Sequence, residues 1–413
     1  MTGKAVIDAA MANPLMAVQR LAAVGVMVQP NGRGEALGTL ANVREVLEKH
    51  PRFSGHFWHD TFHQELFTTW NGKSPRRWAD VDRLAITDVL QGEMGLAKFT
   101  PDIVEQAVMV LAMKHQCDAL KAWLQSLRWD GVLRLDSWLT QAAGAPHDDY
   151  HIAVARNFLI SMVARGIVPG CKVDTMPVFE GSQGKGKSTL LATLGGPFYA
   201  ELTDSLDSKD FFVSIQGKWL VEIAELDAFR KSDITRIKQV LSSQTDRFRP
   251  PYGKHSIDSP RRTVFAGTTN ESDYLRDATG ARRFWPVAVG AIDIAWLSKN
   301  REQLFAEAVE CYKAHATWWE VPEQAHRQHA EERREDDAWE PAIADYSLGR
   351  NEIIAHDILR DAIGLETARQ GKTEQMRVGK ILRALGWERK TARKGSRAIK
   401  VWLRKQAEPE TPF

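Results

Sequence analysis

The chain has 413 residues, with 55 Lys and Arg against 53 Asp and Glu and a net charge of +2. This balance excludes binding of nucleic acid through overall charge, so any such affinity must come from local basic clusters. Three widely spaced cysteines predict neither a disulfide framework nor a zinc site and fit a cytoplasmic protein. No apolar run reaches about 18 residues, the length that a membrane-spanning helix needs, and no signal-peptide pattern is expected at the start of the sequence.

The N-terminal part is predicted to be a loosely ordered arm, 1–36, followed by a mostly helical domain, 37–150. The arm is rich in Ala, Met and Gly. Aromatic and partly alternating residues over 53–70 predict a short hairpin. Thr100 is the expected N-cap of a helix that has proline at its first position. Apolar residues at helical spacing predict helices over 39–50, 76–95 and 100–127.

The middle of the chain, 151–320, alternates predicted helices with predicted strands. This alternation is typical of an α/β domain with a parallel or mixed sheet. The charged stretch 321–347 after it predicts a solvated helix or linker. The predicted helices cover 151–167 and 186–196, and the predicted strands cover 176–181, 218–226 and 261–270.

The last unit, 348–405, is predicted to be two helices followed by a basic hairpin, which is the outline of a winged helix, with a tail over 406–413. Between Met376 and Lys405 there are eleven Lys or Arg and one acid, so contact with nucleic-acid phosphates is expected. The alternative is a solvated basic surface. The basic residues expected to contact DNA are Arg377, Lys380, Arg383, Arg393, Lys394 and Arg397.

Residues 181–188 match the phosphate-binding Walker A pattern G-x-x-x-x-G-K-[ST], after a predicted strand and before a predicted helix. Its glycines let backbone N–H groups surround a phosphate at a helix N-terminus. Lys187 is expected to contact the β- and γ-phosphates of ATP, and the Ser188 hydroxyl to hold Mg²⁺. The expected nucleotide-binding residues are Gly181, Ser182, Gln183, Gly184, Lys185, Gly186, Lys187, Ser188 and Thr189.

The strand in "KWLVEIAELD" carries acids, and hydrolysis of ATP needs one carboxylate near Mg²⁺ and one that polarises the attacking water. Glu225 is the predicted water-activating base. Glu222 and Asp227 are alternatives, and either can be the acid near the metal. An acid in an apolar strand is costly unless it is paired or near a metal. At the end of the next strand, Asn270 is predicted to orient the water.

Two further stretches carry cations. Arg282 and Arg283 precede an aromatic pair, and they are interpreted as an arginine finger donated to the ATP of the next subunit, or else as a surface ion-pair cluster. The stretch "DRFRPPYGKHSIDSPRR" predicts a hairpin. Near its tip Lys254 offers a charge to phosphate, and His255 and Tyr252 can pack on a sugar or base. The alternative for this stretch is an ordinary surface loop.

In this order, the P-loop, "WLVEIAELD", "DRFRPPYGK", "TTN" and "ATGARRFWPV" resemble the virulence-associated E (VapE-like) family of phage and genomic-island proteins, over roughly 130–320. That family is similar to the superfamily 3 helicases within the AAA+ ATPases. The resemblance implies a P-loop AAA+ core and an ATP-driven ring, expected to be a hexamer. The ring would move on DNA during replication of a phage or mobile element, and a hairpin at the position of "DRFRPPYGK" would hold DNA in its channel.

Carried over residue by residue, the resemblance puts Lys187 and Ser188 in Walker A and Glu225 at the catalytic position of Walker B. It puts Asn270 at sensor 1, and Arg282 or Arg283 at the finger. The chain departs from the usual Walker B because Ala224, rather than an acid, precedes Glu225. The acid near Mg²⁺ therefore stays open between Glu222 and Asp227.

Two functions follow from these features. The first is an ATP-dependent DNA helicase or translocase, with ATP and Mg²⁺ as cofactors and single-stranded or forked DNA, further copies of the chain and other replication proteins as partners. The second is an ATP-switched origin-binding or initiator protein without processive unwinding. A small-molecule P-loop kinase is disfavoured by the paired arginines, the sensor asparagine and the basic C-terminal unit.

Overall fold

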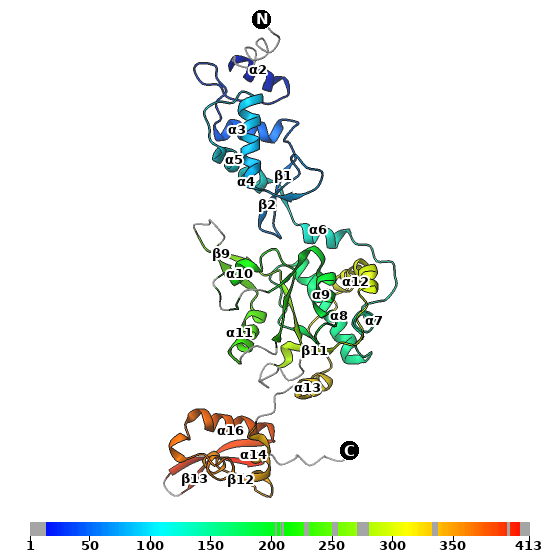
Figure 1. Cartoon of the computed structure of the whole chain (residues 1–413), viewed down its shortest axis with the longest axis vertical. Coiled ribbons are helices and arrows are strands. Elements are labelled where there is room, and N and C mark those ends of the chain that lie inside the picture. The colour runs from blue at the N-terminus through cyan, green and yellow to red at the C-terminus, as the bar shows by residue number, and fades with distance from the viewer. Residues whose placement is uncertain are drawn as a thin grey trace. The chain divides into compact units, whose positions relative to one another are not determined.

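The computed structural model describes residues 14–202, 205–206, 208, 210–226, 231–249, 255–270, 281–332, 338–394 and 397–404. The chain divides into two compact units, Met1–Arg333 and Arg334–Phe413 (Figure 1). Within the described ranges, no helix has the length and apolar character that crossing a membrane requires.

The first part of the larger unit combines helices with a small sheet, so the prediction of a mostly helical domain holds only in part. β1 and β2 pair antiparallel, which confirms the hairpin predicted over 53–70. The helices are α2 (Pro14–Ala23), α3 (Leu40–Lys49), α4 (Asp80–Asp88) with a π-helical turn (Val89–Glu93), and α5 (Pro101–Lys114). The strands, in sheet order, are β3 (Arg76–Arg77), β2 (Glu65–Thr68), β1 (Phe57–Asp60) and β4 (Gln116–Cys117).

Two expectations for this part are wrong in detail. Residues 14–36 are not a loose arm, because α2 and the following chain bury Leu21 and Val26 in the same core as α3 and α5. The predicted helix 100–127 is interrupted, because β4 pairs with β1 and Asp118 then caps a new helix by accepting from the Lys121 backbone N–H at 2.8 Å. Helical spacing continued across this break and concealed it.

The centre of the larger unit is a five-stranded parallel sheet, and this confirms the predicted mixed α/β class with a parallel sheet. Side chains along the strands alternate between two buried faces: Phe179 lies in one core cluster and Val178 in the other. The strands, in sheet order, are β11 (Phe284–Ala288), β5 (Met176–Glu180), β10 (Val264–Thr269), β7 (Leu220–Ile223) and β6 (Tyr199–Glu201).

Helices cover both faces of this sheet (Figure 1). One face packs against α6 (Ala119–Ser126), α7 (Trp138–Ala143), α8 (Asp149–Ile167), α9 (Lys187–Gly195) and α12 (Ile294–Lys313). The other packs against α10 (Phe211–Ser214) and α11 (Lys231–Ser242). Short 3₁₀ turns lie at Gly196–Phe198 and Ala281–Arg283. The helices between Ala119 and Lys313 thus belong to the core of the parallel sheet.

A two-stranded antiparallel hairpin, β8 (Thr245–Phe248) and β9 (Ile257–Pro260), precedes β10 and confirms the hairpin predicted there. Its base is fixed by Arg261, which is fully buried and bonded to the buried carboxylate of Asp246. The charged stretch after α12 contains α13 (Glu323–Glu332). This helix is not simply solvated, because the buried His326 ring bonds the Phe284 carbonyl at 3.0 Å.

The smaller unit is built around a three-stranded antiparallel sheet of order β12–β14–β13. The first of the two helices predicted in this unit is wrong at its start, because Glu352–Ile353 forms a short strand that pairs antiparallel with the last strand of the unit. The elements are α14 (Glu340–Ser347), β12 (Glu352–Ile353), α15 (Ala355–Asp357) continued by a π-helical turn (Ile358–Ala362), a 3₁₀ turn (Thr367–Arg369), α16 (Lys372–Ala384), β13 (Trp387–Lys394) and β14 (Arg397–Arg404). Val378 and Ile381 of α16 pack in its core with Trp387 and Trp402.

Candidate nucleotide site at the carboxyl edge of the sheet

The glycine-rich loop 181–186 connects the end of β5 with the start of α9. Gly184 and Gly186 have φ of +82° and +89°, in the left-handed region that side chains other than glycine adopt at a cost. Gly186 is the N-cap of α9, and no side chain caps this helix end. Backbone N–H groups at a helix start need an acceptor, and an anion is a suitable one.

Lys187, the first residue of α9, is 8% exposed and turns back into this loop. Its ammonium donates to the carbonyls of Gly181 and Ser182, and to the Asn270 side-chain oxygen at 3.2 Å. Asn270 follows β10, which lies directly beside β5. The predicted lysine and asparagine are therefore brought together across two strands.

Glu222 lies in β7 and is fully buried. The Ser188 hydroxyl donates to its Oε1 at 2.7 Å, and the Thr268 hydroxyl of β10 donates to the same oxygen at 2.7 Å. The Tyr199 hydroxyl of β6 donates to Oε2 at 2.5 Å. Three donors offset the cost of burying a carboxylate in an apolar strand.

Of the two acids left open by the sequence, the structure brings Glu222 against Ser188, while Asp227 lies outside the described residues. A hydroxyl and a carboxylate oxygen side by side suit Mg²⁺, which takes oxygen ligands from one or two side chains and fills the rest with water and phosphate. In the ranges that the structure describes, no three His, Cys, Asp or Glu side chains gather as a metal site.

Glu225 lies two residues beyond the end of β7, at the sheet edge that carries the loop, and its side chain is exposed. Its φ is +52°, unusual for a residue other than glycine. The turn lets the next residue, Leu226, return to the core, where it fills the space beside Gly267. The structure thus places Glu225 at the edge of the sheet that carries the glycine-rich loop, with its side chain open to water.

Tyr199 and Thr268 are contacts of Glu222 that sequence reasoning missed. Burial, together with the hydrogen bond to Glu222, raises the pKa of Tyr199 well above its ordinary value, so its hydroxyl stays a donor. No local pattern marks either residue, since both reach Glu222 from other strands of the sheet.

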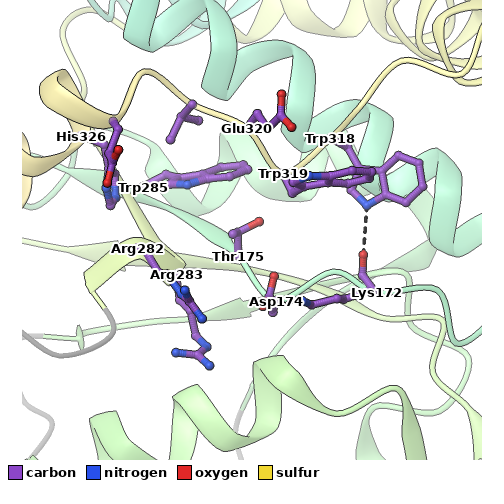
Figure 2. Close-up of a pocket in the computed structure, with 12 residues that line it drawn as sticks. Lys172, Asp174, Thr175, Arg282, Arg283, Trp285, Trp318, Trp319, Glu320 and His326 are labelled. Carbon is purple, nitrogen blue, oxygen red and sulfur yellow. Dashed lines mark hydrogen bonds and ion pairs between the residues drawn. The ribbon is translucent and has the colours of Figure 1, made fainter.

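Arg282 and Arg283 lie at the opposite edge of the sheet. They immediately precede β11, whose first residue pairs with Met176, the first residue of β5. The four residue steps of β5 separate this edge from the glycine-rich loop by about 13 Å. Arg282 is exposed, and Arg283 donates to the Ser242 hydroxyl at 3.2 Å. Both line a cavity of about 680 Å³ (Figure 2).

The candidate DNA-binding residues fall in two places. His255 is exposed beside β9, while Tyr252 and Lys254 lie outside the described residues. On α16, the Arg377 guanidinium lies 3.9 Å from the centre of the Trp339 ring. The Arg383 guanidinium lies 5.7 Å from the centre of the Trp402 ring. Lys380 is half-buried on the same helix, and Arg393, Lys394 and Arg397 lie in β13 and β14 with side chains that the structure does not describe.

Comparison with solved structures shows likeness in fold. A structure titled the apo structure of the NrS-1 C-terminal region (305–718) shares 11% identity with this chain, covers 95% of it and is itself covered in full, with a TM-score of 0.51. A second structure of that region, in its A form, shares 12% identity over 89% of this chain and all of its own length, with a TM-score of 0.47.

Comparison with curated proteins gave no match. Among protein families, the model described as the virulence-associated protein E-like domain matches residues 124–338, just over half of the 413 residues. The match begins in α6 and ends beyond α13, so it spans the parallel sheet and every residue of the candidate nucleotide site. The chain belongs to the virulence-associated protein E-like family.

Proposed function

We propose that the chain is an ATP-dependent DNA helicase or translocase that acts in replication of a phage or mobile element. The observation that carries the proposal is the joining of Lys187 to Asn270 and of Ser188 to Glu222 at one helix start. A lysine, a hydroxyl, an amide and a carboxylate gathered around a glycine-rich loop suit transfer of a phosphoryl group from ATP to water. The core would be a P-loop domain of the AAA+ class, similar to superfamily 3 helicases.

In this proposal Lys187 leaves the loop carbonyls and binds the β- and γ-phosphates. Ser188 and Glu222 hold Mg²⁺, which neutralises charge on the phosphates. Asn270 orients the attacking water, and Glu225 takes its proton. The order of strands supports these roles, since β10 lies between β5 and β7 and presents Asn270 between the loop and the acids.

The arginine pair is proposed to act on the nucleotide of a neighbouring copy. The length of β5 puts Arg282 and Arg283 beyond reach of the loop in their own chain. A contact between opposite edges of two copies is heterologous, and it closes into a ring when the rotation between copies closes. We therefore propose a homo-oligomeric ring, with a hexamer as the expected size.

The smaller unit is proposed to be a DNA-binding winged-helix-like domain over 348–405. Its order of strand, two helices and two strands supports this, as do the cations on α16. Arg377 and Arg383 hold their guanidinium groups against indole rings, which orders them for contact with phosphates.

The deciding experiment measures ATP hydrolysis with and without single-stranded DNA, and strand displacement on a forked duplex. A helicase hydrolyses ATP faster with DNA and displaces the strand. An ATP-switched initiator remains the second candidate, favoured by the exposed position of Glu225, and it would bind DNA when ATP is bound without displacing a strand. ATP turnover that is indifferent to DNA, together with DNA binding that is indifferent to ATP, would contradict both.

Tyr199→Phe is expected to weaken the metal site, because one oxygen of the buried Glu222 loses its donor. We expect the Mg²⁺ concentration for half-maximal ATPase to rise about tenfold, as loss of a group that orients a metal ligand does. Stability should fall by about 1–3 kcal/mol from the unsatisfied oxygen. The assay is a Mg²⁺ titration of ATPase beside thermal unfolding, and an unchanged Mg²⁺ requirement would show that Tyr199 has no part in the site.

The double variant Lys254→Ala with His255→Ala is expected to keep basal ATPase, since neither residue belongs to the nucleotide site. DNA should no longer stimulate its ATPase, and it should no longer displace a strand. The slope of log binding constant against log salt concentration should become shallower by about one unit, because one phosphate contact is lost. Arg247→Ala is the matched control, because this 78% exposed arginine lies in β8 of the same hairpin. Unwinding at the wild-type rate would place the DNA grip elsewhere, first in the basic segment 377–405.

A further inference from the structure

A cavity lies at the edge of the sheet opposite the glycine-rich loop, and its lining suggests a binding site of its own. The cavity of about 680 Å³ falls within the usual range for small-molecule sites. In Figure 2 the indoles of Trp285 and Trp319 are seen edge-on along one side of it, and Arg282 and Arg283 lie toward its other end. Three tryptophans and three cations line this cavity: Trp285, Trp318, Trp319, Lys172, Arg282 and Arg283.

Among the described residues, several of these side chains have donors without acceptors. Trp285 is 1% exposed, and its indole Nε1 has no hydrogen-bond partner, although a buried indole N–H usually finds one. Within the described part of the chain, Arg282 and Arg283 form no ion pair, and the one side-chain bond is that of Arg283 to the neutral Ser242 hydroxyl. The two guanidinium groups on one cavity call for a ligand rich in acceptors.

The acidic residues on the lining do not supply those acceptors. Asp174 lies 3.7 Å from the Lys172 ammonium, and Glu323 pairs with Arg327 at 2.5 Å. Glu320 is exposed. Among the described lining residues, the two arginines therefore outweigh the one remaining carboxylate, Glu320, and this excess of positive charge favours an anion.

The aromatic side of the cavity is also prepared for contact. Trp318 is held by its indole N–H, which donates to the Lys172 carbonyl at 3.0 Å, and its ring meets that of Trp319 edge-on, with centres 5.0 Å apart. Trp319 is 52% exposed, a large apolar surface left in water by a side chain that is highly buried on average. A flat ring that stacks on Trp319 would remove that surface from water.

We propose that this cavity binds a nucleoside phosphate, with its phosphates on Arg282 and Arg283 and its base on the indole face of Trp319. A nucleoside phosphate combines the flat ring, the acceptors and the negative charge that the lining lacks. The identification of the ligand as a nucleotide rests on the proposed ATPase activity, whereas the cavity is observed independently of that proposal. The nucleotide comes either from solution or from the glycine-rich loop of a second copy, and these sources share one chemistry.

The test uses the full chain carrying Lys187→Ala, so that its own glycine-rich loop no longer holds nucleotide, and titrates the ATP analogue AMP-PNP by calorimetry. We expect residual binding that Trp319→Ala weakens about 5- to 100-fold, the effect of losing one base–aromatic stack. Trp319→Phe should keep most of the affinity. Trp58→Ala, which removes a partly exposed tryptophan outside the cavity, is the matched control. Thermal unfolding verifies that each variant is folded.

Protein concentration separates the two sources. Binding that depends on Trp319 in the dilute monomer supports nucleotide taken from solution. The chain with intact Lys187 is then added as the copy that presents nucleotide. AMP-PNP binding that depends on Trp319 only in this assembly supports the neighbouring loop as the source. AMP-PNP binding that Trp319→Ala leaves unchanged in both states overturns the proposal. Failure of the proposed ATPase is a separate result, seen as ATP hydrolysis that survives Lys187→Ala.

Discussion

Lys187→Ala is expected to lower ATP hydrolysis by at least about 10²- to 10³-fold, the usual cost of removing one group that stabilises the transferring phosphoryl charge. ATP binding should weaken as well, because the β- and γ-phosphates lose their positive partner. The fold should survive, since the Gly181 and Ser182 carbonyls that Lys187 now bonds belong to a surface loop that water can reach. Steady-state hydrolysis and fluorescent-nucleotide binding measure the two effects.

Lys187→Arg tests geometry separately from charge. The guanidinium keeps the positive charge but is larger and planar, so it does not fit where the ammonium lies between Gly181, Ser182 and Asn270. We expect hydrolysis to stay low in this variant. Lys114→Ala, which removes an exposed lysine paired with Glu48, is the control for loss of a surface charge. Hydrolysis by Lys187→Ala within a few-fold of wild type would contradict the proposed nucleotide site.

The nucleotide loop was predictable because its constraints are local. Glycines that permit positive φ, a strand before them and a helix after them all lie within about twenty consecutive residues, and the sequence pattern contains each of them. The β8–β9 hairpin was predictable for the same reason, since turn-forming residues separate two short alternating runs.

The order of strands was not predictable in this way. Parallel strands pair across long connections, so no local signal indicates that β10 lies between β5 and β7 or that β11 joins the far side of β5. The donors around Glu222 depend on that order: Tyr199 reaches it from β6 and Thr268 from β10. The position of Glu222 beside Ser188 therefore needed the structure.

Composition misled where local character and tertiary packing differ. Alanine and methionine in 14–36 suggested a loose arm, but alanine is also the strongest helix former, and Leu21 of α2 is buried in a core that the sequence could not assign to it. Glu225 is a different case. Its left-handed backbone accompanies the burial of Leu226 beside Gly267, a contact between the segment after β7 and strand β10 that no pattern around Glu225 encodes.

Arg283→Ala and Glu225→Gln are each expected to leave a folded chain that binds ATP but hydrolyses it about 10³-fold more slowly or worse, the scale of losing an arginine finger. Arg282→Ala should behave like Arg283→Ala. The reason is geometric: the arginines lie at the sheet edge opposite their own loop, and Glu225 at the edge that carries it. A complete site thus combines Glu225 of one copy with the arginines of another.

Mixing the inactive Arg283→Ala and Glu225→Gln chains should then restore hydrolysis. With random assembly of an equal mixture, about a quarter of the heterologous interfaces join an intact Glu225 to an intact arginine pair. Mixing Lys187→Ala with Glu225→Gln is the matched control and should restore nothing, because both residues serve the nucleotide of their own copy. Absence of rescue at every mixing ratio would refute a shared site, and full activity of an isolated monomer would refute the ring.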